Sequence, residues 1–167
     1  ARGPLGPVQA FQAVVTGKTA RAADLEAWAR YLQATSGDDR NKHEARDAAR
    51  RAAELEPSVG RLLLAGELAE DRNQRREWID KAEALTKKRG KESVDVLLAQ
   101  AELARTGLSW QTATRHFDRI LAIDPDQVDA IAGRVATYNT AGLKRTALAT
   151  LEGALQRNPN ALGLLNM

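Results

Sequence analysis

The chain has 167 residues, of which 43% are hydrophobic and only 4% are aromatic, and its formal net charge is +3. It contains no cysteine, which excludes disulfides, thiolate catalysis and cysteine-based zinc sites. No apolar run is long enough to cross a bilayer, so we expect no membrane insertion, and the residues given contain no secretory signal.

The first half of the chain shows helical periodicity. We expect a flanking segment over residues 1–22 that contains a short helix over residues 8–16. Longer helices are then expected over about residues 23–35, 41–55, 59–70 and 75–86. On the second of these, Ala45, Ala49 and Ala52 share one face. The basic run Lys87-Lys88-Arg89-Gly90-Lys91 is expected to form a turn after residue 86.

Three prolines divide the chain at a fixed period. Pro57 and Pro125 are 68 residues apart, and Pro159 follows after another 34, so all three fit a period of 34 residues. A helix cannot easily continue through proline, because the ring removes a backbone donor and clashes with the preceding turn. A fixed period of this length indicates a stacked helical repeat.

The last two periods share a spacing of small, large apolar and proline residues. The residues are Ala113, Phe117 and Pro125 in one period and Ala147, Leu151 and Pro159 in the next. The last period also has Tyr138 and Ala154 at an aromatic and a small position. In this spacing the chain resembles the tetratricopeptide-repeat (TPR) family.

The resemblance implies an all-α fold, a right-handed α-solenoid of antiparallel helix pairs. About four pairs would cover residues 23–160, and residues 161–167 would begin a truncated or capping helix. The small residues would let paired helices approach, and the large residue would fill the gap between repeats. Asp124-Pro125-Asp126 and Asn158-Pro159-Asn160 are expected to end one helix and to cap the next.

The resemblance also implies a groove lined by the first helix of each pair. Offsets from the prolines place eight residues on it: Asp95, Leu98, Glu102, Arg105, Asp129, Ala132, Ala136 and Asn139. Family members that grip acidic C-termini carry basic and amide side chains where this chain has Leu98 and Ala132. A basic or amphipathic partner segment therefore suits the groove better than an acidic tail. Asp95 and Asp129 have a second interpretation, because a carboxylate stabilises the first turn of a helix.

No pattern indicates catalysis. The two histidines are His43, with Asp47 one turn later, and His116, which is expected at a helix edge. A surface ion pair is the favoured interpretation of the first. Neither a zinc-protease motif nor a glycine-rich phosphate loop is present. We therefore expect no enzyme, no catalytic residue, no metal site and no cofactor.

Three functions remain open. The favoured one is a non-catalytic scaffold that binds a protein or peptide, or another domain of its own chain, in the groove. The second is a regulatory arm that binds nucleic acid or another anionic partner through the Lys87–Lys91 run. Nucleic acid is disfavoured, because Trp78 is the only aromatic residue nearby and single strands are usually stacked on several. The third is a rigid intramolecular spacer. Trp28, Trp78 and Trp110 are expected to pack between helices.

The source and compartment are indicated only by composition and by the start of the chain. The basic residues are mostly arginine, which is typical of GC-rich bacterial genomes. Because the chain begins at Ala1 without a methionine, we expect a segment of a longer protein. The cytoplasm is favoured, and the periplasm stays open because a leader could precede Ala1.

Overall fold

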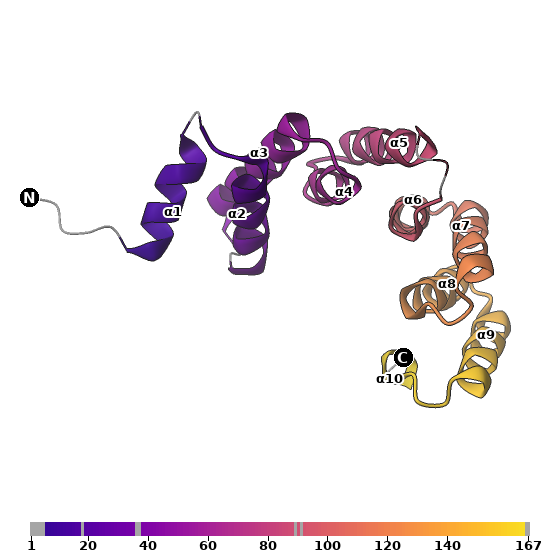
Figure 1. Ribbon diagram of the computed structural model, residues 1–167. Coiled ribbons are helices and arrows are strands. Elements are labelled where there is room, and N and C mark those ends of the chain that lie inside the picture. The colour runs from indigo at the N-terminus through magenta and orange to yellow at the C-terminus, as the bar shows by residue number, and fades with distance from the viewer. Residues whose placement is uncertain (1–5, 18, 36–37, 89, 91, 166–167) are drawn as a thin grey trace, which may run out of the picture. The chain divides into compact units, whose positions relative to one another are not determined.

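The computed structural model describes residues 6–17, 19–35, 38–88, 90 and 92–165, and these residues form helices and no strand (Figure 1). The expected all-α fold class is thus confirmed. The chain divides into two compact units, residues 1–89 and 90–167. The boundaries at 22/23 and 160/161 proposed for the repeat domain stay predictions.

The first unit contains two helix pairs preceded by a shorter helix. Its elements are α1 (Pro7–Thr16), α2 (Ala22–Thr35), α3 (Asp39–Leu55), α4 (Val59–Glu67) and α5 (Arg72–Lys88). Helix α2 packs against α3, and α4 packs against α5, while α3 also contacts α4. Alanines form the buried face of α3: Ala45, Ala48, Ala49, Ala52 and Ala53. These small side chains let α2 approach closely with Leu25, Trp28 and Leu32.

Helix α5 is longer than the sequence predicts. It begins at Arg72 because the Asp71 carboxylate accepts hydrogen bonds from the backbone N–H groups of Asn73 and Gln74, at 2.8 and 2.9 Å. It continues to Lys88, so the expectation of a basic turn after residue 86 is wrong for Lys87 and Lys88. Cations in the last turn of a helix are favourable to its dipole, and Lys87 pairs with Glu83 at 3.0 Å. Arg89 and Lys91 lie outside the described residues.

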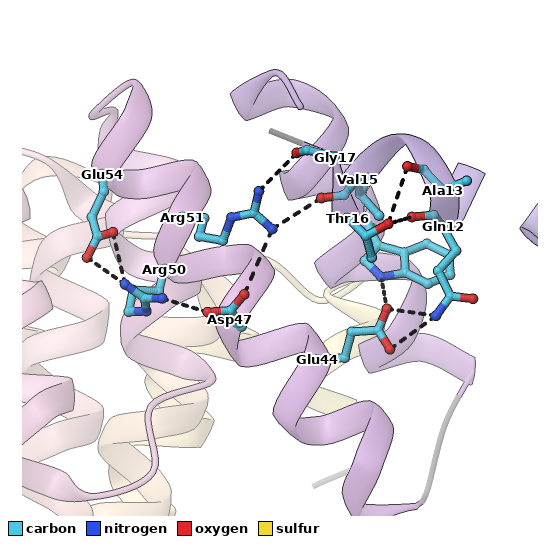
Figure 2. A network of polar contacts seen from close by, with 11 residues as sticks. Gln12, Ala13, Val15, Thr16, Gly17, Glu44, Asp47, Arg50, Arg51 and Glu54 are labelled. Atoms are coloured by element: carbon cyan, nitrogen blue, oxygen red, sulfur yellow. Dashed lines mark hydrogen bonds and ion pairs between the residues drawn. The ribbon is translucent and has the colours of Figure 1, made fainter. Parts of the chain in front are cut away.

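Helix α1 is held to the first pair by the polar contacts drawn in Figure 2 and also by an aromatic contact. The Glu44 carboxylate accepts hydrogen bonds from Trp28 Nε1 at 2.9 Å and from Gln12 Nε2 at 3.1 Å. Arg51 donates to the carbonyl oxygens of Val15 and Gly17, at 3.1 and 3.4 Å. The rings of Phe11 and Trp28 lie 5.8 Å apart. Trp28 therefore packs between helices, as the sequence analysis expects.

The second unit repeats the paired arrangement. Its elements are α6 (Val94–Thr106), α7 (Trp110–Ile123), α8 (Val128–Thr140), α9 (Lys144–Arg157) and the short α10 (Leu162–Leu165). Helix α6 pairs with α7 and α8 pairs with α9, and α8 also contacts α6, α7 and α10. Phe117 and Ile120 of α7 are fully buried in one cluster, and Ile131 and Val135 of α8 belong to the next. Helix α8 thus lies at the centre of this unit.

The turns of the second unit differ from the predicted caps. Helix α7 ends at Ile123 and α9 at Arg157, directly before the two proline motifs. The N-cap of α8, however, is Gln127, whose side chain accepts from the Ala130 N–H. Asp126, which belongs to the motif expected to supply the cap, instead forms an ion pair with Arg157 at 3.4 Å. Gln127 lies one position nearer to α8 than Asp126, and its side chain is long enough to reach the Ala130 N–H.

Candidate partner-binding surface

The eight predicted groove residues lie on two neighbouring helices of the second unit. Helices α6 and α8 are in contact, and each contributes four of the residues. We call these eight residues the α6–α8 surface. Asp95, Asp129 and Asn139 are exposed, and the other five are half-buried: Leu98, Glu102, Arg105, Ala132 and Ala136. Leu98 and Ala132 also pack against the two buried clusters, so the surface has an apolar floor.

The charges of the α6–α8 surface sum to a negative value. The guanidinium of Arg105 donates to the Glu102 carboxylate, with Nη2 and Oε2 2.7 Å apart, and this hydrogen bond raises the pKa of Arg105. These two charges therefore compensate each other. Asp95 and Asp129 form no ion pair with any described residue, and Asp129 accepts only a long hydrogen bond from Gln127, at 3.4 Å. Two uncompensated carboxylates remain, one in the first turn of each helix.

A small cavity lies where α6 and α8 end and α7 begins. It has a volume of about 110 Å³, and its lining consists of Arg105, Leu108, Trp110, Thr137, Thr140 and Ala141. Trp110 is 38% exposed there, so the expectation that it packs between helices is wrong. Trp78, by contrast, is half-buried and lies against α4, where a Cβ added to Gly66 would be 3.3 Å from the Trp78 Cβ. We call the cavity the turn-edge pocket.

The predicted repeat-packing residues occupy three kinds of position. Four are buried: Ala113, Phe117, Ala147 and Ala154. Tyr138 and Leu151 are half-buried against the cluster around α8. Pro125 and Pro159 are exposed in the turns that follow α7 and α9.

The predicted surface ion pair between His43 and Asp47 does not form. Asp47 forms ion pairs with Arg50 and Arg51, at 2.6 and 3.9 Å, and none with His43. The Nδ1 of His43 lies 3.3 Å from Arg46 Nη1. His116 is half-buried. Within the described part of the chain, no three histidine or acidic side chains gather closely enough to hold a metal ion. No described helix is both long and apolar enough to cross a membrane.

Solved structures resemble this arrangement of helix pairs. Two crystal structures of MamA superpose with a TM-score of 0.69 at 14% sequence identity. The first match covers 92% of this chain and 82% of MamA, and the second covers 91% and 86%. The chain has the tetratricopeptide-repeat fold.

A further solved structure, YrrB, is described as a TPR protein with an unusual peptide-binding site. It aligns over 95% of this chain and 97% of its own length, with 16% identity and a TM-score of 0.42. No protein-family model and no curated protein match the sequence.

The tetratricopeptide-repeat register identifies a residue that the sequence analysis overlooked. Leu108, in the turn between α6 and α7, lies 34 positions before Gly142, in the turn between α8 and α9. Both have a positive φ, 59° for Leu108 and 76° for Gly142, so the position adopts a conformation that favours glycine. The 34-residue period could have predicted the positive φ, because it aligns Leu108 with Gly142, a glycine in a turn.

Proposed function

We propose that the chain is a non-catalytic scaffold that binds a basic or amphipathic segment of a protein partner on the α6–α8 surface. The observation that supports this proposal most directly is the pair of uncompensated carboxylates, Asp95 and Asp129, beside the apolar floor of Leu98 and Ala132. Cationic side chains of a partner would meet the carboxylates, and its apolar side chains would cover the floor. The TPR fold supplies rigid helices on which such residues keep their spacing.

An acidic tail fits this surface less well. The one guanidinium on it, Arg105, is already held by Glu102. A carboxylate clamp would need basic and amide side chains at positions 98 and 132, where the side chains are apolar.

The anionic-partner alternative has weaker support. Lys87 pairs with Glu83, and the Lys81 ammonium lies 3.9 Å from the centre of the Trp78 ring. That ring therefore has one face occupied by a side chain of its own helix. Stacking of nucleobases needs open aromatic faces, so this part of α5 offers little to a single strand.

Affinity capture from cell extract, followed by titration of the captured partner, tests the proposal. The double variant Asp95→Asn/Asp129→Asn removes both charges with little change of shape. Exposed ion pairs contribute about 0.2–1 kcal/mol each, so the loss of two is expected to lower the affinity about two- to thirtyfold. Glu152→Gln is the matched control, because Glu152 is exposed on α9 of the same unit and forms no ion pair with any described residue.

A partner that survives nuclease treatment and binds less tightly to the double variant would support the scaffold. Retention lost on nuclease treatment would favour the anionic-partner alternative. If no partner is retained at all, the spacer becomes the better account of the chain.

A further inference from the structure

The turn-edge pocket has the size and lining of a site for one side chain. Its volume of about 110 Å³ is somewhat below that of an engineered apolar cavity that binds benzene, about 150 Å³. Leu108, Trp110 and Ala141 supply apolar walls, and Arg105, Thr137 and Thr140 complete the lining. The pocket therefore suits a large aliphatic or aromatic side chain better than a polar group.

Leu108 is placed in this pocket at a conformational cost. Its φ of 59° is unfavourable for a side chain with a Cβ, and glycine occupies the corresponding position 34 residues later. Its side chain is 77% exposed, so it contributes little burial that could offset the cost. Strain that brings no packing is often found where a residue contacts a ligand.

The edge of the unit that carries this pocket has a positive charge. No Asp or Glu occurs between Glu102 and Asp118, or between Asp129 and Glu152. In the second of these intervals Lys144 and Arg145 open α9, where both are exposed and form no ion pair with any described residue. They follow Leu143, which is 39% exposed. Carboxylates would therefore be attracted to this edge, in contrast to the first turns of α6 and α8.

We propose that the turn-edge pocket anchors one large apolar side chain of the partner, flanked by carboxylates that face Lys144 and Arg145. This inference rests on the proposed function and adds a direction to it. Arg105 follows Asp95 by ten residues on α6, which is about 15 Å along the helix axis. The partner segment then carries basic residues at one end and an acidic apolar anchor at the other, about 15 Å away. That spacing corresponds to roughly five extended residues or ten helical ones.

A matched pair of synthetic peptides tests this polarity. The first has lysines at one end and one phenylalanine between glutamates at the other, and the second has its lysines and glutamates exchanged. The chain has three tryptophans, so its indole N–H groups give three NMR signals, and Trp110→Phe identifies the one that belongs to the pocket. We expect the first peptide to shift the Trp110 signal saturably, and the exchanged peptide to bind at least tenfold more weakly.

Leu108→Gly separates binding from stability. Because it relieves the positive φ, this variant is expected to melt about 3 °C higher while binding the first peptide at least fivefold more weakly. Lys144→Glu/Arg145→Glu should weaken binding to a similar extent and reduce its dependence on salt. Ile123→Ala is the control, because Ile123 is exposed at the far end of α7 and should leave binding unchanged.

The inference is overturned if the first peptide leaves the Trp110 signal in place, or if both peptides bind equally well. Unchanged affinity in Leu108→Gly overturns it too. An oligonucleotide that shifts the Trp110 signal more strongly than the first peptide would assign the edge to nucleic acid instead. If Asp95→Asn/Asp129→Asn weakens binding of the captured partner and Leu108→Gly does not, the scaffold proposal is supported and the anchor-pocket proposal is overturned. If neither variant weakens it, both proposals fail.

Discussion

The ring of Phe117 occupies the space that a side chain at position 133 would need. A Cβ placed on Gly133 would lie 2.3 Å from Cζ of Phe117 and 2.5 Å from its Cε1. Helices α7 and α8 therefore approach each other at a point where one repeat supplies a large residue and the next supplies none. The contact connects the two helix pairs of the second unit.

Gly133→Ala should destabilise this unit even though alanine favours helices. The gain in helix propensity is about 0.5–1 kcal/mol, whereas overpacking a fully buried ring costs about 1–3 kcal/mol. We expect a net loss of about 1–2 kcal/mol in the free energy of unfolding, measured by urea titration with circular dichroism.

Gly153→Ala is the control for that experiment, because nothing lies within 4 Å of a Cβ at position 153 of α9. It should leave stability unchanged or raise it by up to about 1 kcal/mol. Equal effects of the two substitutions would contradict the close approach of Phe117. Phe117→Leu replaces the ring by a smaller side chain. When it is combined with Gly133→Ala, the loss of stability caused by Gly133→Ala should be smaller.

Glu44→Ala should loosen α1. The variant leaves the indole N–H of buried Trp28 without its acceptor and removes the acceptor of Gln12. An unsatisfied buried donor costs about 1–3 kcal/mol, so we expect a loss of that size and faster proteolysis of residues 6–17. Glu44→Gln keeps one carbonyl oxygen and should lose less. If α1 in the alanine variant resists protease as well as the parent does, Glu44 does not hold it.

Two serines at helix N-termini should differ in their contribution to stability. Ser58 accepts a hydrogen bond from the Arg61 N–H at 3.3 Å, whereas Ser109 makes no side-chain cap bond to α7. Ser58→Ala should therefore cost about 1 kcal/mol, and Ser109→Ala less than about 0.5 kcal/mol, in thermal unfolding. A larger loss for Ser109→Ala would show that its hydroxyl caps α7 in solution.

The pKa of Asp24 should respond to its neighbour on the chain. The guanidinium of Arg21, 2.8 Å away, donates a hydrogen bond that lowers the pKa of this carboxyl below its usual value. The pair therefore stabilises the folded chain at pH above the unfolded pKa, and this contribution is lost as the pH falls through the folded pKa. Arg21→Ala should raise the Asp24 pKa in a carboxyl NMR titration. A titration curve that does not move would show that the pair is open in solution.

Sequence periodicity was sufficient to predict the helix pairs, because it identifies the buried face of each helix. The alanines of α3 and Phe117 of α7 lie on such faces. It was poorer at helix ends, where one side chain decides. Asp71 starts α5 earlier than its apolar pattern indicates, and Gln127 takes the capping role expected of the Asp124-Pro125-Asp126 motif. Surface contacts were also missed, because a helical surface offers several partners at similar spacing.

The candidate surface, too, could be predicted only in part from the sequence. Offsets from the prolines were enough to choose residues on α6 and α8, since the period is fixed. They gave no information on which charges compensate each other, so the pairing of Arg105 with Glu102 was not foreseen. The exposure of Trp110 was also missed, because it depends on how the α6–α7 turn is built around Leu108.

The buried alanine positions of α3 tolerate almost no substitution. A larger side chain there would push α2 away, and glycine, the one smaller choice, would weaken the helix by about 1 kcal/mol. Alanine also has no rotamers to lose when it is buried, so this interface forms with little loss of side-chain freedom. New binding properties in such a chain must therefore arise on the outward faces of its helices and in its turns, while this seam stays as it is.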